Sequence, residues 1–437
     1  MRDVIFGLIL LGLLPLCIWR PWIGILVWTW IGLMNPHRLT WEFTSLPVAM
    51  VTAALILLGM VFRRDYKAPP WNRELILLVM LMGYFTLTSM AAWYPPAAWE
   101  YWVRVLKMVG MVLVTTMLIH GRKRIELLLL VVALSIGFYG FKGGIFSMAT
   151  AGQYRVQGPE GSMIAGNTFL GLAMAMVLPL LFALAREAAV KWKRTLLYAT
   201  AILTFISIPF TYSRGALLGL AVVVPGVFPR LKKLFILLPL LIPLAFLARD
   251  YLPEKLVQRA QTIETYDEDN SAMQRIRAWA VAIGIAKQSP LLGAGFDFEE
   301  LPDPSRWWSH VPPDLFGYGT MKTHVAHSIY FSVLGQHGFV ALAMFLMLLI
   351  FTYRDFRRLE SQTMANPDVA WIGPYARALR IGLAGYMVAG AFLNAAYFDL
   401  SYLFVAFTAI FRREVRATGN RTSMQAESAK NGVLASV

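Results

Sequence analysis

The chain has 437 residues, of which 58% are apolar and 15% charged, and its formal net charge is +15. Soluble globular domains are about half apolar and about a quarter charged, so this composition excludes an ordinary soluble domain. The basic residues lie in short clusters between apolar runs and form no single patch, which argues against nucleic-acid binding. The single cysteine, Cys17, excludes an intramolecular disulfide.

Two short apolar runs open the chain, Val4–Trp19 and Trp22–Met34, with Arg20-Pro21 between them. No small-residue cleavage site follows the first run, so we expect it to be retained and not removed as a signal peptide. Loops on the two sides of the membrane alternate along the chain, and this alternation is simple only if one of the two runs is not a full span. One of them is therefore expected to be tilted, re-entrant or interfacial.

Several later runs approach or exceed the ~18 apolar residues that cross a bilayer. The basic clusters fall on alternate loops, which is the positive-inside pattern and places those loops and the C-terminal tail in the cytoplasm. About twelve spans follow from this alternation, since each helix needs ~20 residues. The sequence thus predicts an all-α polytopic membrane protein, with clear spans at Leu75–Met90, Gly166–Ala185, Thr195–Tyr212 and Ala326–Phe351.

One loop on the expected outer side, Asp250–Val325, is about 75 residues long, so it should carry structure of its own. Within it, Ser271–Gln288 has the periodicity of an amphipathic helix that could lie flat on the bilayer. The expected stripe is Met273, Ile276, Ala280, Ile283 and Lys287. The chain then divides into N-terminal transmembrane helices (1–249), a large periplasmic loop (250–325), C-terminal transmembrane helices (326–411) and a basic cytoplasmic tail (412–437).

Arginines at the expected outer face are the first candidates for chemistry. Arg214 interrupts an apolar stretch, where it is either a snorkelling side chain at a helix end or an anion clamp. Arg275 and Arg277 lie on the predicted loop helix and are either solvated charges or ligands of an anion. Guanidinium groups match phosphate oxygens with two parallel hydrogen bonds, so two converging arginines would suit a pyrophosphate.

The segment from Thr323 to Ser328 is the densest polar stretch and opens an apolar run. His324, His327 and Ser328 should lie at the outer mouth of that helix, with His337 about ten residues, ~15 Å, deeper. Histidine titrates near neutral pH and is the usual general base for a hydroxyl. A structural hydrogen-bonding role remains the alternative for each of these histidines.

Weaker candidates complete the set. Arg155 and Asn167 flank another expected outer loop, and Arg104 and Lys107 lie about one turn apart near the start of a span, facing a cavity or anchoring the helix. The sequence has no paired cysteines and no His-Glu-x-x-His motif, so we expect no metal site and no cofactor.

In this order, the motifs resemble the O-antigen ligase and polymerase superfamily. The residues that carry the resemblance are Arg275-x-x-x-Trp279, the run from Pro290 to Gly295, His327-Ser328 and Gly338, together with Ser213-Arg214-Gly215 upstream. The opening from Arg20 through Arg38, with Arg155-Val-Gln-Gly-Pro, is similar to the branch of exosortase-associated O-glycosylation ligases. The chain departs from the family pattern at Gln336, where members often carry Glu.

The resemblance implies a metal-independent, GT-C-like membrane glycosyltransferase of the bacterial inner membrane. It would move a glycan en bloc from undecaprenyl pyrophosphate to an acceptor hydroxyl, that of lipid A–core oligosaccharide or of a protein, in lipopolysaccharide O-antigen biosynthesis. The active site would face the periplasm, and the protein is expected to be a monomer. Arg214 and Arg275 would bind the pyrophosphate and His327 would act as the general base. Arg277, Arg155, Asn167, His324 and Ser328 are further candidates for binding substrate.

Other functions stay open at this point. An O-antigen polymerase or a protein O-oligosaccharyltransferase of the same superfamily would share the motifs and differ in acceptor. A transporter or lipid flippase belongs to a different class, and transporters often show two similar halves with charges near the midplane. Here the polar candidates lie at one expected face, and the sequence shows no duplication.

Overall fold

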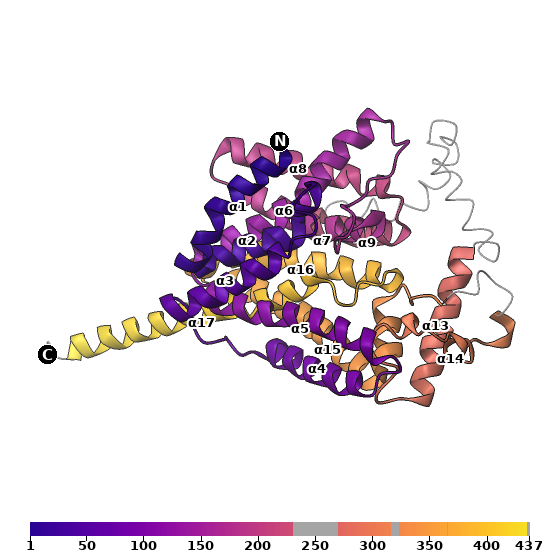
Figure 1. Ribbon diagram of the computed structural model, residues 1–437. Helices are drawn as coiled ribbons and strands as arrows, with labels where there is room; N and C mark the ends of the chain where they lie inside the picture. Colours follow the sequence, from indigo (N-terminus) through magenta and orange to yellow (C-terminus); the bar gives the residue numbers. More distant parts are fainter. Residues whose placement is uncertain (230–269, 316–322, 365, 435–437) are drawn as a thin grey trace.

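The computed structural model describes residues 1–229, 270–315, 323–364 and 366–434, and the helices of these residues form one bundle with a smaller helical unit at one end (Figure 1). Apart from one isolated β-bridge between Gly158 and Gly166, the described regular elements are helical. The α-helices are α1 (Arg2–Trp19), α2 (Pro21–Met34), α3 (Val48–Arg63), α4 (Arg73–Met90), α5 (Pro95–Leu118), α6 (Arg122–Ala149), α7 (Gly166–Glu187), α8 (Lys191–Ser207), α9 (Arg214–Val227), α13 (Asn270–Gln288), α14 (Ser305–Trp308), α15 (Ile329–Met364), α16 (Ile372–Ala389) and α17 (Asp399–Leu434). Short 3-10 turns are η1 (Pro36–Leu39), η2 (Pro209–Thr211), η5 (Phe298–Glu300), η6 (Pro313–Leu315), η7 (Pro367–Val369) and η8 (Gly390–Phe392).

Apolar composition makes this an all-helical multi-pass membrane protein, as the sequence predicts. Among the described residues, six helices are long and apolar enough to cross a bilayer, namely α1, α4, α5, α6, α7 and α15. Three shorter apolar helices, α2, α3 and α9, accompany them. The total of about twelve spans stays a prediction.

The two N-terminal runs form separate helices that break at Arg20, whose backbone is not helical (φ −137°, ψ 80°). Pro21 occupies the first position of α2, where its missing N–H costs nothing. Both helices pack on α3. Only 17% of α1 is buried within the protein, so most of this apolar helix is left to face lipid.

Helix α7 lies at the centre of the bundle, where it packs against α6, α8, α9 and α16. Close contact between α6 and α8 depends on Gly140 and Gly144, since a Cβ at either position would overlap Thr204 or the main chain of Leu203. The hydrophobic effect does not drive helices together within lipid, so their association depends on close packing. Small residues one turn apart allow the two backbones to approach closely.

The bundle has two distinct ends. The basic end contains the connections after α3, α5, α7 and α15, and it is tied together by Arg124–Asp65 (3.0 Å) and by Arg412 with Asp355. The loop end contains the connections before α5, α7, α9, α15 and α17. The small unit with α13 and α14 lies at the loop end, opposite the C-terminus (Figure 1).

Helix α15 is broken at Gly338 (φ 76°, ψ −171°), and the loop after α13 fills the break. The amides of Ala294 and Gly295 donate to the carbonyls of Gly335 and Gln336 at 3.0 and 2.8 Å, and the amide of Phe339 donates to Pro290 at 2.8 Å. A broken membrane helix needs such partners, because unsatisfied main-chain groups are costly in hydrocarbon. Within the motif run from Pro290 to Gly295, these contacts are therefore structural.

The loop helix begins within one residue of its expected position, but the predicted stripe was misplaced. The most buried positions of α13 include Arg277, Val281 and Ile285, whereas Lys287 is exposed and Ile276 only half-buried. The helix packs on α15 and on a cluster that includes Phe298, Trp307 and Trp308. The buried face of α13 is therefore shifted by one residue from the predicted apolar stripe. It packs against other parts of the protein. The remainder of the predicted loop, residues 250–269 and 316–322, lies outside the described residues.

Candidate active site at the loop end

Arg214 lies at the first position of α9, and the turn before it is fixed from three sides. The Ser213 hydroxyl caps the helix by accepting from the amide of Ala216 at 3.2 Å. The Asn167 amide group donates to the carbonyl of Thr211 at 2.7 Å, and the Tyr212 hydroxyl donates to Gly152. The predicted binding residue Asn167 thus supports the turn that carries Arg214.

Arg155 lies on the loop that covers this turn. The amide of Val156 donates to Phe210 at 3.0 Å, which places the loop beside η2. Burial raises the pKa of Tyr212, and the positive charge of Arg155 acts in the opposite direction, so this guanidinium lies near Tyr212. Arg155 is exposed and therefore accessible to a charged ligand at the same rim.

His327 precedes α15 and is positioned by α13. The indole of Trp279 donates to the carbonyl of Ala326 at 2.6 Å and stacks on Phe331 at 4.9 Å. His327 itself adopts a left-handed backbone conformation (φ 45°). A non-glycine residue in this region is uncommon, and such conformations concentrate at functional sites.

The pKa of the His327 imidazole falls from 6.5 to about 4, first because of burial and then because Arg275 and His324 add positive charge beside it. His327 is nevertheless exposed at the surface of the loop end. His327 is therefore neutral at pH 7 and able to accept a proton. The structure brings Arg275 and His324 close to His327.

The turn after α16 separates the N-termini of α9 and α15. A Cβ on Gly215 would lie 3.3 Å from the carbonyl of Ala389, and one on Gly390 would lie 2.7 Å from Ile329. Residues 389–390 thus contact α9 immediately after Arg214 on one side, and the first residue of α15 on the other. Both helix N-termini lie at the loop end, where their dipoles favour an anion.

Two predicted binding residues are buried. Arg277 is completely buried, with its guanidinium carbon 4.9 Å from the ring centre of Trp308. Burial lowers its pKa. Its surroundings indicate that it holds α13 against α14. The Ser328 hydroxyl is also buried, and it has no hydrogen-bond partner within the described part of the chain.

His337 lies in the interior, at the break in α15. Its Nδ1 is 2.6 Å from the Thr88 hydroxyl, and its ring packs against Phe85 and Phe296. The neighbouring Gln336 accepts a hydrogen bond from the Tyr397 hydroxyl at 2.8 Å. These contacts give both residues structural partners inside the bundle.

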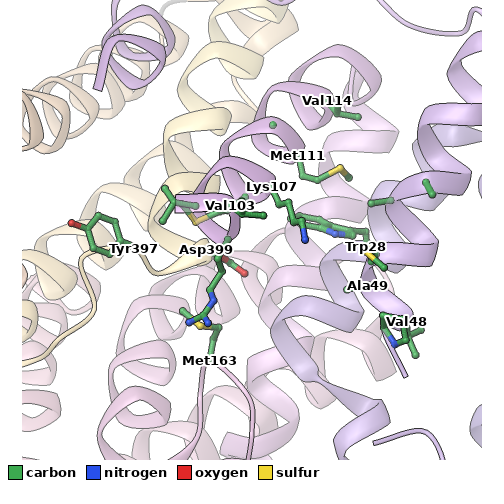
Figure 2. A pocket seen from close by; sticks show the side chains of 18 of the residues that line it. Trp28, Val48, Ala49, Val103, Lys107, Met111, Val114, Met163, Tyr397 and Asp399 are labelled. Carbon is green, nitrogen blue, oxygen red and sulfur yellow. The ribbon is translucent and has the colours of Figure 1, made fainter. Parts of the chain in front are cut away.

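Arg104 and Lys107 line a cavity of about 1050 Å³ between α2, α3 and α5 (Figure 2). Arg104 is 3.7 Å from Glu100 and lies over the ring of Tyr101. Tyr397 and Asp399, near the start of α17, also line the cavity. Both residues therefore line a cavity, and it lies against the N-terminal helices.

Sequence reasoning missed two acidic residues of the loop end. Burial raises the pKa of Asp297 to about 6 and that of Glu299 to about 8, and neighbouring carboxylates contribute to both. The main-chain carbonyl of Glu299 accepts from the Thr323 hydroxyl at 2.8 Å, so Glu299 borders the histidine segment. No sequence signal distinguishes it from the other acidic residues of the loop. In the described ranges, no three His, Cys, Asp or Glu residues cluster as metal ligands would.

Comparison with protein families matches two stretches of the chain. Residues 1–189 match a family of unknown function (DUF5935), and residues 199–346 match the O-antigen ligase family. Residues 199–346 are therefore similar to an O-antigen ligase domain. This domain contains Arg214, α13 and the start of α15. The match to the O-antigen ligase family covers less than half of the chain. Comparison with curated proteins gives no match.

Proposed function

We propose that this protein is a glycosyltransferase that moves a preassembled glycan from undecaprenyl pyrophosphate to an acceptor hydroxyl, with lipid A–core oligosaccharide as the acceptor. The reaction takes place at the periplasmic face of the bacterial inner membrane, onto which the loop end opens, and the C-terminus of α17 is cytoplasmic. In this orientation the basic end lies in the cytoplasm, as the positive-inside rule requires.

The observation that carries the proposal is the pairing of a neutral imidazole with an adjacent cation. His327 is kept neutral by its surroundings and by Arg275, and Trp279 ties the two segments together. A neutral histidine accepts a proton from an acceptor hydroxyl, and the cation beside it attracts a phosphate. The family match to residues 199–346 independently supports transfer from a lipid-linked donor.

The reaction forms one bond and breaks another at the anomeric carbon. The acceptor oxygen attacks this carbon while its proton passes to His327. The bond to the phosphate oxygen breaks, and undecaprenyl pyrophosphate leaves with the bonding electron pair. Arg214 and Arg275 stabilise the negative charge that develops on the leaving oxygen. Attack opposite the leaving group predicts inversion of configuration.

Substitution at the three positions tests this assignment in purified membranes that contain lipid-linked glycan and acceptor. His327→Asn is the informative variant, since asparagine tolerates the left-handed backbone and lacks the basic imidazole. We expect His327→Asn, Arg214→Ala and Arg275→Ala each to lower transfer at least 100-fold, with normal expression and thermal stability. Lys287→Ala is the matched control, because it removes an exposed cation from the same helix as Arg275.

Full transfer by His327→Asn would reject the general-base role. The chemical identity of the product distinguishes the proposed reaction from the other reactions of the same superfamily. A ligase yields one glycan on a different acceptor, a polymerase lengthens the lipid-linked chain, and a protein transferase modifies a polypeptide.

A further inference from the structure

The three helices that form most of the cavity wall, α2, α3 and α5, lie within the part of the chain that matches a family of unknown function. Figure 2 shows Trp28, Ala49, Lys107 and Met111 around the same space. From Arg104 to Val114, the wall formed by α5 is ten residues, about 15 Å, long. The cavity volume of about 1050 Å³ is at the upper end of the ~300–1,000 Å³ found for ligand sites.

The cavity opens toward the surrounding lipid. Helix α2 packs on both α3 and α5, whereas α3 and α5 are not packed extensively on each other. Leu57 of α3 and Val103 of α5 line the cavity and are 50% and 38% exposed. A ligand can therefore enter sideways from the membrane. An apolar chain is the group that such walls accommodate.

Cations lie on one part of this apolar wall. Lys107 is twelve residues, about 18 Å, from the start of α5 at Pro95, and its side chain is exposed within the cavity. No acidic side chain among the described residues forms an ion pair with it. An ionisable residue this far along a spanning helix is costly unless it meets an anion or water.

Arg38 of η1 adds a third cation to Arg104 and Lys107 of α5. A Cβ on Gly161 would lie 3.1 Å from a terminal guanidinium nitrogen of Arg38, so this group contacts the loop between α6 and α7. Its Nε is buried and has no hydrogen-bond partner within the residues that the structure describes. Arg38, Arg104 and Lys107 thus face one cavity from two elements.

We propose that this cavity binds a membrane lipid that carries a phosphate headgroup. The phosphate contacts Arg38, Arg104 and Lys107, and the apolar chain lies along Trp28, Leu57 and Val114. This role belongs to the N-terminal helices and does not depend on the transfer step at His327. Undecaprenyl phosphate and phosphatidylglycerol both supply this chemistry, so the experiment includes both.

Native mass spectrometry of the full-length purified protein tests the proposal, with undecaprenyl phosphate, phosphatidylglycerol and undecaprenol as probes. We expect one bound molecule of a phosphate-headed lipid, held at least tenfold more tightly than neutral undecaprenol. Preference between the first two probes identifies the source of the lipid. Equal binding of undecaprenol and undecaprenyl phosphate would overturn the role of the cations, and no binding of any probe would overturn the site.

Variants locate the bound lipid. Lys107→Ala should weaken binding about tenfold, as expected for loss of one charged hydrogen bond. Lys107→Arg should retain binding. Lys142→Ala is the matched control, since Lys142 is an exposed lysine of the spanning helix α6 that does not line the cavity.

A larger side chain tests the apolar part separately. Ala53→Trp fills the cavity from α3 and should abolish retention of every probe while the protein stays folded. Retention by this variant would place the lipid elsewhere. His327→Asn should bind the lipid as the wild type does, so loss of transfer and loss of lipid binding are separate outcomes.

Discussion

The indole nitrogen of Trp279 lies 2.6 Å from the carbonyl oxygen of Ala326, the residue directly before His327. This bond joins the helix that carries Arg275 to the segment that carries the imidazole. The ring of Trp279 also stacks on Phe331 in the first turn of α15. Trp279 therefore acts as a positioning residue for both groups.

Trp279→Phe should lower transfer while preserving the fold, because phenylalanine keeps the ring stack and removes the donor. A net hydrogen bond of about 0.5–1.5 kcal/mol corresponds to a roughly 2- to 10-fold loss of rate. Transfer assays and thermal unfolding in detergent measure the two effects. Trp192→Phe is the control, since this indole is 64% exposed on α8. An unchanged transfer rate for Trp279→Phe would show that the indole hydrogen bond does not position the site.

The pH dependence of transfer should follow His327. With a pKa of about 4, nearly all of the imidazole is neutral at pH 5.5, so kcat/KM should change little between pH 5.5 and 7. An unperturbed histidine of pKa ~6.5 would leave about a tenth neutral at pH 5.5. Bound pyrophosphate offsets the charge of Arg275 and raises the pKa of His327, so the acid limb of kcat should lie at higher pH than that of kcat/KM.

Initial rates at several donor concentrations between pH 4.5 and 8 separate these two profiles. An acid limb of kcat/KM near pH 6.5 would contradict the effect of Arg275 and burial on the free enzyme.

Glu299 should make the protein less stable as pH rises. Its pKa is about 8 in the folded protein and 4.5 in the unfolded chain, so the folded state binds the proton more tightly between these values. The resulting stabilisation is complete below pH 4.5 and is lost as pH rises through 8. Glu299→Gln should remove this dependence. Thermal unfolding between pH 5 and 9 measures it, with the exposed Glu160→Gln as control. Parallel curves for wild type and Glu299→Gln would show that the carboxyl is ionised when folded.

Gly293→Ala should destabilise the loop end. Gly293 has φ +62°, and a Cβ there would lie 2.6 Å from the carbonyl carbon of Gln336. The strain and overlap together should cost on the order of 2–4 kcal/mol. Gly83→Ala in α4 is the matched control, since it meets nothing within 4 Å and should be neutral or stabilising by about 0.5–1 kcal/mol. Thermal unfolding compares the two, and equal melting temperatures would contradict the close approach.

Sequence patterns predicted the helices well where apolar composition alone determines them. Helix α4 ends at Met90, as expected, and α7 begins at Gly166. The proximity of Arg275 and His327 could not be derived from the sequence, because motif order does not show which segments converge. The buried face of α13 could not be predicted either, because Trp307 and Trp308, which are distant in sequence, determine which side of the helix is covered.

Arg277 shows why a site cannot be read from residue type alone. It is two residues from Arg275 on the same helix, and the helical rotation of about 200° between them points the two guanidinium groups to different sides. Arg277 is buried beside Trp308, whereas Arg275 lies near His327. The break in α15 was equally hidden, since a lone glycine in an apolar run is compatible with an unbroken helix.

The break at Gly338 also has a consequence for biogenesis. Its carbonyl and amide groups are paired by residues 290–295, which the ribosome makes more than thirty residues before the second half of α15. The hydrogen-bonding partners are thus already synthesised when this part of α15 emerges, and once folded they pair its peptide groups. A change that delays the folding of the 290–295 segment should therefore expose the nascent protein to membrane quality control, even when each apolar helix is intact.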